Sequence, residues 1–273
     1  METLELLSRI KIPRNQTAVM SLLLQYASNG YCYYAQGVVA PAKLGNFVTK
    51  LGGIYPIALD KVARSLQRKR GQAAYQLVVL PDDEIVRWVL LSTPGSGNLL
   101  DRPLDAGMKV RDLRLFGERL RWKQYELLRE PKSWQDRTSN GKPITKTQRT
   151  WSWRLIPERV KAHEAHIVAC ARNHNRPALD AEVKALSFMP MFAQVRRQVA
   201  KLWKEADKVW RKFNGREKAE PLTIPPLFYL RKIKIYSTPA LSVLGFVEQW
   251  KGHRSDSPAP IVDGRDEELE PPV

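Results

Sequence analysis

The chain has 273 residues, 43% of them hydrophobic, which is enough apolar material for one large core or two modest domains. Lys and Arg number 45 against 28 Asp and Glu, so the formal net charge is +17 and we expect a polyanionic partner, above all nucleic acid. No run of about 18 apolar residues and no apolar signal segment occurs, so we expect a cytoplasmic protein that does not bind membranes.

The first part of the chain, residues 1–156, predicts an α+β sheet domain. A helix is expected at 15–27, because apolar side chains share one face there and Ser28-Asn29-Gly30 ends it. The pattern then predicts a strand, a helix and a two-stranded hairpin, at residues 31–39, 41–55, 73–80 and 85–91. This β-α-β-β order is that of the first three quarters of a ferredoxin-like unit.

Two further strands are expected at 121–129 and 150–156. Between them, 133–149 is polar and basic and contains Ser139-Asn140-Gly141, a composition that predicts a mobile loop. Helical spacing then dominates a basic region at 157–254, which ends with a late strand. The three helices and the strand are expected at residues 158–171, 178–188, 191–213 and 227–236.

The last segment, 255–273, differs in charge from the rest of the chain. It contains six acidic residues, one Arg and four prolines, a composition that predicts a disordered tail. Its net charge is −5, which leaves +22 on residues 1–254. The part of the chain expected to fold is therefore more basic than the total suggests.

The predicted helix at 191–213 has an apolar face and a basic face. Its apolar seam runs from Phe192 to Phe213 at gaps of three and four residues. The opposite face carries a cationic ridge, flanked by Arg196 and Lys212, that consists of Arg197, Lys201, Lys204, Lys208 and Arg211. Such a ridge suits contact with successive phosphates. The other interpretation is an ordinary solvated helix face.

Two junctions between elements and the late strand carry the other candidate cations. Junctions are exposed, and an arginine there can contact a phosphate through two hydrogen bonds. The candidates are Arg64, Arg68, Lys69, Arg70, Arg119, Arg121, Lys232 and Lys234. The alternative is that these segments only improve solubility.

No catalytic, metal or cofactor site is predicted. His163, His166, Cys170 and His174 fall on one helical face, but at about 1.5 Å per residue the first and last are roughly 16 Å apart, too far for one ion. Neither His163 nor His166 has an acidic partner that the sequence identifies, as a general base would need. Cys32 and Cys170 form no disulfide framework, and we expect no disulfide.

Several short aromatic and basic motifs resemble those of one protein group. They are Gly-Tyr-Cys-Tyr-Tyr from Gly30, Arg-Trp-Val-Leu-Leu from Arg87, Tyr-Glu-Leu from Tyr125, Trp-Ser-Trp-Arg from Trp151 and Gln-Val-Arg-Arg-Gln-Val from Gln194. The group comprises uncharacterised proteins of proteobacterial conjugative plasmids and integrative elements, and the match spans most of the chain. The resemblance implies a mobile-element setting and assigns no activity and no catalytic residue.

These observations predict a non-enzymatic nucleic-acid-binding accessory protein of a mobile element. It would contact the phosphate backbone of DNA or RNA through helix 191–213 and the basic junctions, with other proteins of a nucleoprotein complex as further partners. One alternative is a metal-independent RNA-processing endoribonuclease on a ferredoxin-like sheet, in which His163 or His166 and a tyrosine move protons. Another is a protein-interaction subunit that buries the apolar seam against a second chain.

Overall fold

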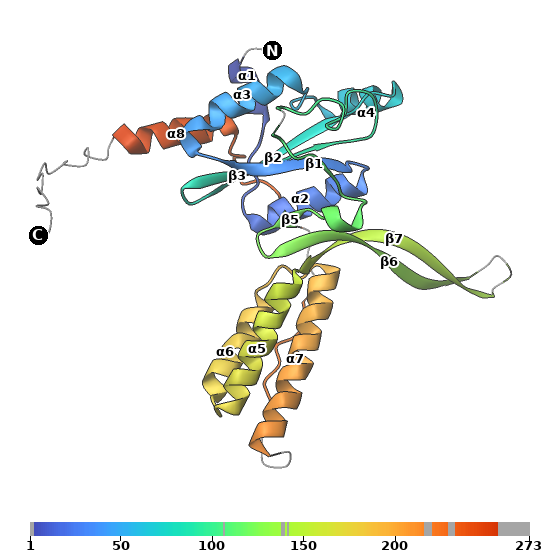
Figure 1. Ribbon diagram of the computed structural model, residues 1–273, viewed down its shortest axis with the longest axis vertical. Coiled ribbons are helices and arrows are strands. Elements are labelled where there is room, and N and C mark those ends of the chain that lie inside the picture. Colours follow the sequence, from blue (N-terminus) through green and yellow to red (C-terminus); the bar gives the residue numbers. More distant parts are fainter. Residues whose placement is uncertain are drawn as a thin grey trace, which may run out of the picture.

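The computed structural model describes residues 3–105, 107–137, 140, 142–215, 220–228 and 233–255, without the side chains of 132, 134 and 251–255. In these ranges the chain forms eight α-helices and seven strands, and the strands make two antiparallel sheets (Figure 1). The fold class is therefore α+β, as predicted. The predicted tail lies outside the described residues except for Ser255, which ends a helix.

The larger sheet has the strand order β2-β3-β1-β4, and each neighbouring pair is antiparallel. Its strands are β1 Tyr33–Val39, β2 Tyr75–Asp82, β3 Ile85–Ser92 and β4 Arg111–Asp112. The predicted β2-β3 hairpin is confirmed, and its turn contains Asp83 at a φ of 52°. In contrast to the long β1-β3 pairing, β4 pairs with β1 only at Tyr33 and Tyr34.

Helices cover both faces of this sheet, which is why its apolar side chains on either side are buried (Figure 1). Around Val79 and Trp88, one face packs against α1 Thr3–Arg9, α3 Leu44–Ile54 and α8 Val243–Ser255. The other face packs around Val78 and Val89 against α2 Gln16–Ser28. The helices predicted at 15–27 and 41–55 are confirmed as α2 and as α3 with the preceding 3-10 turn Pro41–Lys43.

The smaller sheet contains β5 Arg121–Trp122, β6 Tyr125–Arg137 and β7 Pro143–Leu155. β6 and β7 pair along their full length, so the mobile loop predicted at 133–149 is wrong for its described residues. The described residues of 133–149 form the outer half of the β6-β7 hairpin, which projects from the body (Figure 1). Because most side chains of residues 143–150 are exposed, the ribbon lacks the apolar alternation by which a strand is recognised.

Below the sheets in Figure 1, three helices form a bundle. They are α5 Pro157–Arg172, α6 Arg176–Ser187 and α7 Ala193–Asn214, and they confirm the three helices predicted there. Gly215, at a φ of 84°, ends α7, a conformation that glycine adopts without strain. One apolar core joins the bundle to the smaller sheet and α2, as shown by Trp153, whose indole N–H donates to the Met20 carbonyl at 2.8 Å.

Elsewhere the structure departs from the predicted elements. Helices α4 Lys61–Lys69 and α8 occupy segments for which no helix is predicted, and Phe116–Glu118 forms a further 3-10 turn. The late strand predicted at 227–236 is wrong for its described residues, which form no strand, while 229–232 lie outside the described residues. No strand of the described ranges pairs with the backbone of Ile235. Its carbonyl accepts a hydrogen bond from Arg14 N at 3.0 Å, in the segment just before α2.

Candidate functional site

Helix α7 has the two faces that the sequence predicts. Val199, Leu202 and Ala206 of the apolar seam are buried in the core that the bundle shares with the smaller sheet. Two side chains fix the helix: the Gln198 amide pairs with the backbone N and O of Leu155 at 2.8 and 3.1 Å, and the Trp203 indole donates to Val183 O at 3.1 Å. Because the same chain covers it, the seam is not the exposed surface that a protein-interaction role would need.

The cationic ridge lies on the solvent side of α7. Arg197, Lys201, Lys204 and Lys208 are exposed, as is the flanking Lys212, and Arg196 is half-buried. Half-buried Arg211 differs, since its Nε lies 3.0 Å from Asp207 Oδ2. Lys208 lies 3.4 Å from Glu205, whereas Arg197, Lys201 and Lys204 form no ion pair within the described ranges. The ridge therefore offers four exposed cations at helical spacing.

The cations predicted at the first junction lie on α4 and its C-cap. Arg64 turns inward, donating to the Leu59 carbonyl, and belongs to the support of the fold. Arg68, Lys69 and Arg70 are exposed, and Arg68 Nη1 donates to Asn29 O at 3.2 Å. That contact brings the end of α4 next to the turn that follows α2.

The second junction holds one engaged and one exposed arginine. Glu126, whose side chain is only 4% exposed, pairs with Arg119 at 3.1 Å and with Arg154 at 2.6 Å. Arg119 also lies 4.3 Å from the centre of the Phe116 ring, so its guanidinium is committed within the protein. Arg121 on β5 is exposed, and so is Lys234, while Lys232 lies outside the described residues.

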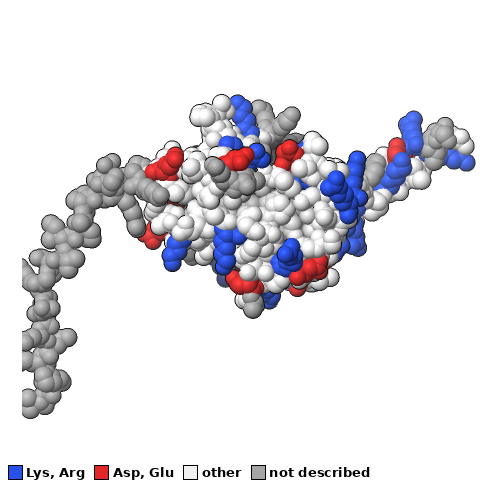
Figure 2. Space-filling view, turned by 90° about the horizontal axis from the view of Figure 1, so that it is seen from above, with Lys and Arg blue, Asp and Glu red and all other residues white. Residues whose placement is uncertain are grey.

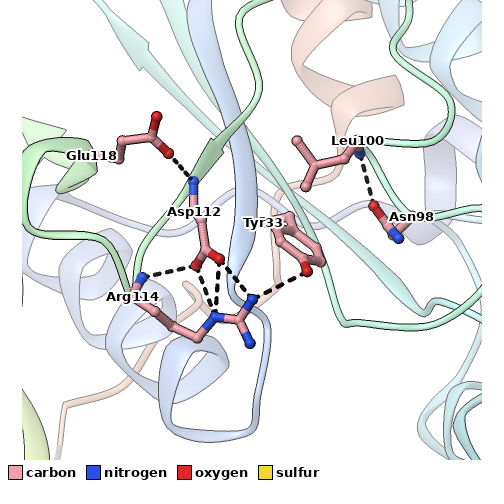
Figure 3. Close-up of polar contacts among 6 residues, drawn as sticks. All are labelled: Tyr33, Asn98, Leu100, Asp112, Arg114 and Glu118. Atoms are coloured by element: carbon pink, nitrogen blue, oxygen red, sulfur yellow. Dashed lines mark hydrogen bonds and ion pairs between the residues drawn. The ribbon is translucent and has the colours of Figure 1, made fainter.

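A basic pocket of about 320 Å³ lies where the projecting hairpin joins the body. The guanidinium of Arg114 is fixed there by the carboxylate of Asp112, with N–O distances of 2.6 to 3.0 Å, and donates to the Tyr33 hydroxyl at 3.1 Å (Figure 3). This carboxylate raises the pKa of Arg114, so the group stays charged. The lining residues are Ala27, Ser28, Gly30, Cys32, Pro94, Arg114, Arg129 and Trp151.

The hairpin beyond this pocket carries cations that the sequence analysis does not single out. We call residues 129–137 and 143–151 the arm. Arg129, Arg137, Lys146 and Arg149 are exposed on it, and Figure 2 shows Lys and Arg side chains gathered on the projecting hairpin. A signal for the strands exists in Thr145 and Thr147, because threonine favours strands and alternates there with longer polar residues.

The histidines of α5 meet an acid that sequence spacing does not reveal. Glu182 of α6 lies 2.6 Å from His163 Nδ1 and 3.9 Å from His166 Nε2. The other ring nitrogen of His163 is buried and has no hydrogen-bond partner among the described residues, so it cannot reach a substrate, whereas His166 is 54% exposed. Cys170 Sγ lies 3.6 Å from His166, and burial, then the Glu182 charge, raises the pKa of this thiol.

Both cysteines, Cys32 and Cys170, are free and buried. Burial also raises the pKa of the Cys32 thiol, although Arg114 opposes the shift. No group of three His, Cys, Asp or Glu within the described ranges has the arrangement of a metal site.

None of the described helices combines the length and apolar character needed to cross a bilayer. Comparisons with protein-family models, curated proteins and solved structures find no match to the chain.

Proposed function

We propose that this protein binds nucleic acid through the phosphate backbone and performs no chemistry on it. The observation that carries the proposal is the ridge on α7, where Arg197, Lys201, Lys204 and Lys208 are exposed at gaps of four, three and four residues. Together with a net charge of +17, this face would attract a polyanion and displace its condensed counterions. The exposed cations at the end of α4 would extend the contact, whereas Arg64 and Arg119 would not take part.

The proposed setting is a mobile genetic element, on the basis of the sequence motifs, with the protein acting in the cytoplasm beside partners that do the chemistry. For the fold, we propose a ferredoxin-like sheet that has lost its second crossover helix. The order β2-β3-β1-β4 with antiparallel neighbours supports this assignment. A complete ferredoxin-like unit would have a second crossover helix between β3 and β4, but the described residues there contain no helix.

The central test is binding across a salt series. If about six phosphates are contacted, affinity should fall on the order of a thousandfold between about 50 and 200 mM salt. Filter binding with single- and double-stranded DNA and RNA measures this slope for each form. Binding that does not change with salt, or no binding to any of the four forms, would reject the proposal.

RNA cleavage remains the alternative, and His166 provides its test. A general base must reach the proton that it removes, and of the two histidines His166 is the exposed one. We expect His166→Ala to leave binding unchanged and the wild type to produce no discrete fragments from its element's transcripts. Fragments that appear with the wild type and vanish with His166→Ala, on a denaturing gel, would favour the endoribonuclease instead.

A further inference from the structure

The two faces of the arm differ in charge. Side chains alternate along a strand, and the register pairs Arg129 with Trp151 and Arg137 with Pro143. One face, which we call the arginine face, therefore consists of residues 129, 131, 133, 135, 137, 143, 145, 147, 149 and 151. It carries three arginines and no acid. On the opposite face, the described side chains include the acids Glu130 and Asp136 beside Lys146.

The charged groups of the arginine face are also exposed and free to contact a ligand. Arg129, Arg137 and Arg149 are exposed, and none of them forms an ion pair within the described ranges. On the opposite face, Lys146 Nζ lies 2.5 Å from Asp136 Oδ2, and Glu130 accepts a hydrogen bond from Gln194 at the start of α7. The described charged groups of the opposite face, Glu130, Asp136 and Lys146, thus have partners, while the arginine face leaves three guanidinium groups for a ligand.

The side chains between the arginines are polar and paired across the strands. The Ser133 and Thr147 hydroxyls lie 2.8 Å apart, and the Gln135 amide donates to the Thr145 hydroxyl at 3.0 Å. An alternative role for these charges is to prevent the exposed ribbon from pairing with strands of other molecules. For that role, charges of either sign on either face would be sufficient. The restriction to arginine, on one face and without acids, is instead typical of a surface that contacts phosphates and guanine edges through paired hydrogen bonds.

The dimensions of the arm fit the major groove of a B-form DNA duplex. Eight residues separate Arg129 from Arg137, roughly 26 Å at about 3.3 Å per residue, which is less than one helical turn of about 34 Å. The major groove of B-form DNA, about 12 Å wide, admits a two-stranded ribbon, but the deep and narrow groove of A-form RNA does not. Single strands need aromatic side chains for stacking, and the arginine face has only Trp151, at its root.

We propose that the arm enters the major groove of duplex DNA with its arginine face toward the phosphates and base edges. This inference rests on the proposed function and names its substrate as B-form duplex. The α7 ridge would supply general attraction, and the arm would supply the preference for a duplex. Binding that is equally strong to single strands or to an RNA duplex would therefore contradict the arm's role and leave the ridge's role intact.

Two variants on the same strand provide a matched test. Arg149→Gln and Lys146→Gln each remove one positive charge from β7, three residues apart and on opposite faces. Fluorescence anisotropy with a mixed-sequence DNA duplex of about two turns should show about fivefold or greater weakening for Arg149→Gln. Lys146→Gln should change affinity by less than about twofold, as expected for one exposed ion pair. The triple variant Arg129→Gln, Arg137→Gln, Arg149→Gln should weaken binding on the order of a hundredfold.

Groove ligands distinguish the site of contact. Methyl green occupies the major groove and should compete with the wild-type protein, whereas netropsin, which occupies the minor groove, should not. Competition by netropsin alone, or equal effects of Arg149→Gln and Lys146→Gln, would overturn the inference. If replacing the exposed α7 cations Arg197, Lys201, Lys204 and Lys208 by Gln weakens binding while all arm variants bind normally, only the arm proposal fails. If the wild type binds no nucleic acid, the proposed function fails with it.

Discussion

Glutamine at Arg197, Lys201, Lys204 and Lys208 will leave the protein folded and greatly weaken its binding to duplex DNA. These side chains are exposed on α7, so their charge can be removed without disturbing the buried seam. Each phosphate that the protein no longer neutralises lowers the slope of log affinity against log salt by about 0.9, so the slope of the quadruple variant should fall by about 3.6. Near 0.1 M salt this corresponds to a reduction in affinity on the order of a thousandfold. Binding isotherms across a salt series measure both quantities.

Arg211 is left unchanged in this variant because it pairs with Asp207. Its replacement would leave the half-buried Asp207 unpaired and confuse a structural effect with a binding effect, whereas the acids paired with Lys208 and Arg9 are more exposed. A control variant, Arg9→Gln, removes a cation from α1, where Arg9 pairs with Glu5 at 2.6 Å. If the quadruple variant keeps the affinity and slope of the wild type, the ridge is a solvated face, and the arm and the end of α4 become the remaining candidates.

Aspartate at Val199 will unfold the protein or break up its helical bundle. Val199 has no exposed surface, so the new carboxylate must be buried without a partner or take up a proton. Either event costs several kcal/mol, which is comparable to the total stability of about 5–15 kcal/mol of an ordinary domain. Thermal melting followed by circular dichroism, together with size-exclusion chromatography, will report the unfolding.

The matched control for that change is Lys201→Asp, two residues further along the same helix. Lys201 is exposed, so the same side chain should be tolerated there with little effect on the melting temperature. Binding to nucleic acid should still weaken, because the ridge then carries a negative charge. Equal melting temperatures for the two variants would mean that α7 does not pack through Val199.

The structure separates the predicted cations into three kinds, for reasons of packing. Lys201 and Lys204 are exposed because the periodicity that buries Val199 and Leu202 turns them outward. Arg119, in the loop before β5, is equally basic in sequence, yet it pairs with Glu126 on β6. A third kind, such as Arg64, turns inward to a backbone carbonyl. Sequence spacing describes neighbours along one element and cannot say which group arrives from another.

Sequence alone predicts several of the elements that have a buried side: α2, α3, the β2-β3 hairpin and the three helices of the bundle. Burial imposes a period on the apolar residues, and that period is readable in one dimension. The arm becomes visible only in the folded structure, because its outer residues are mostly exposed on both faces and so leave no apolar period. The arginine face exists because the β6-β7 register brings residues from two strands to one side, and register is set by pairing across the strands rather than by either strand alone.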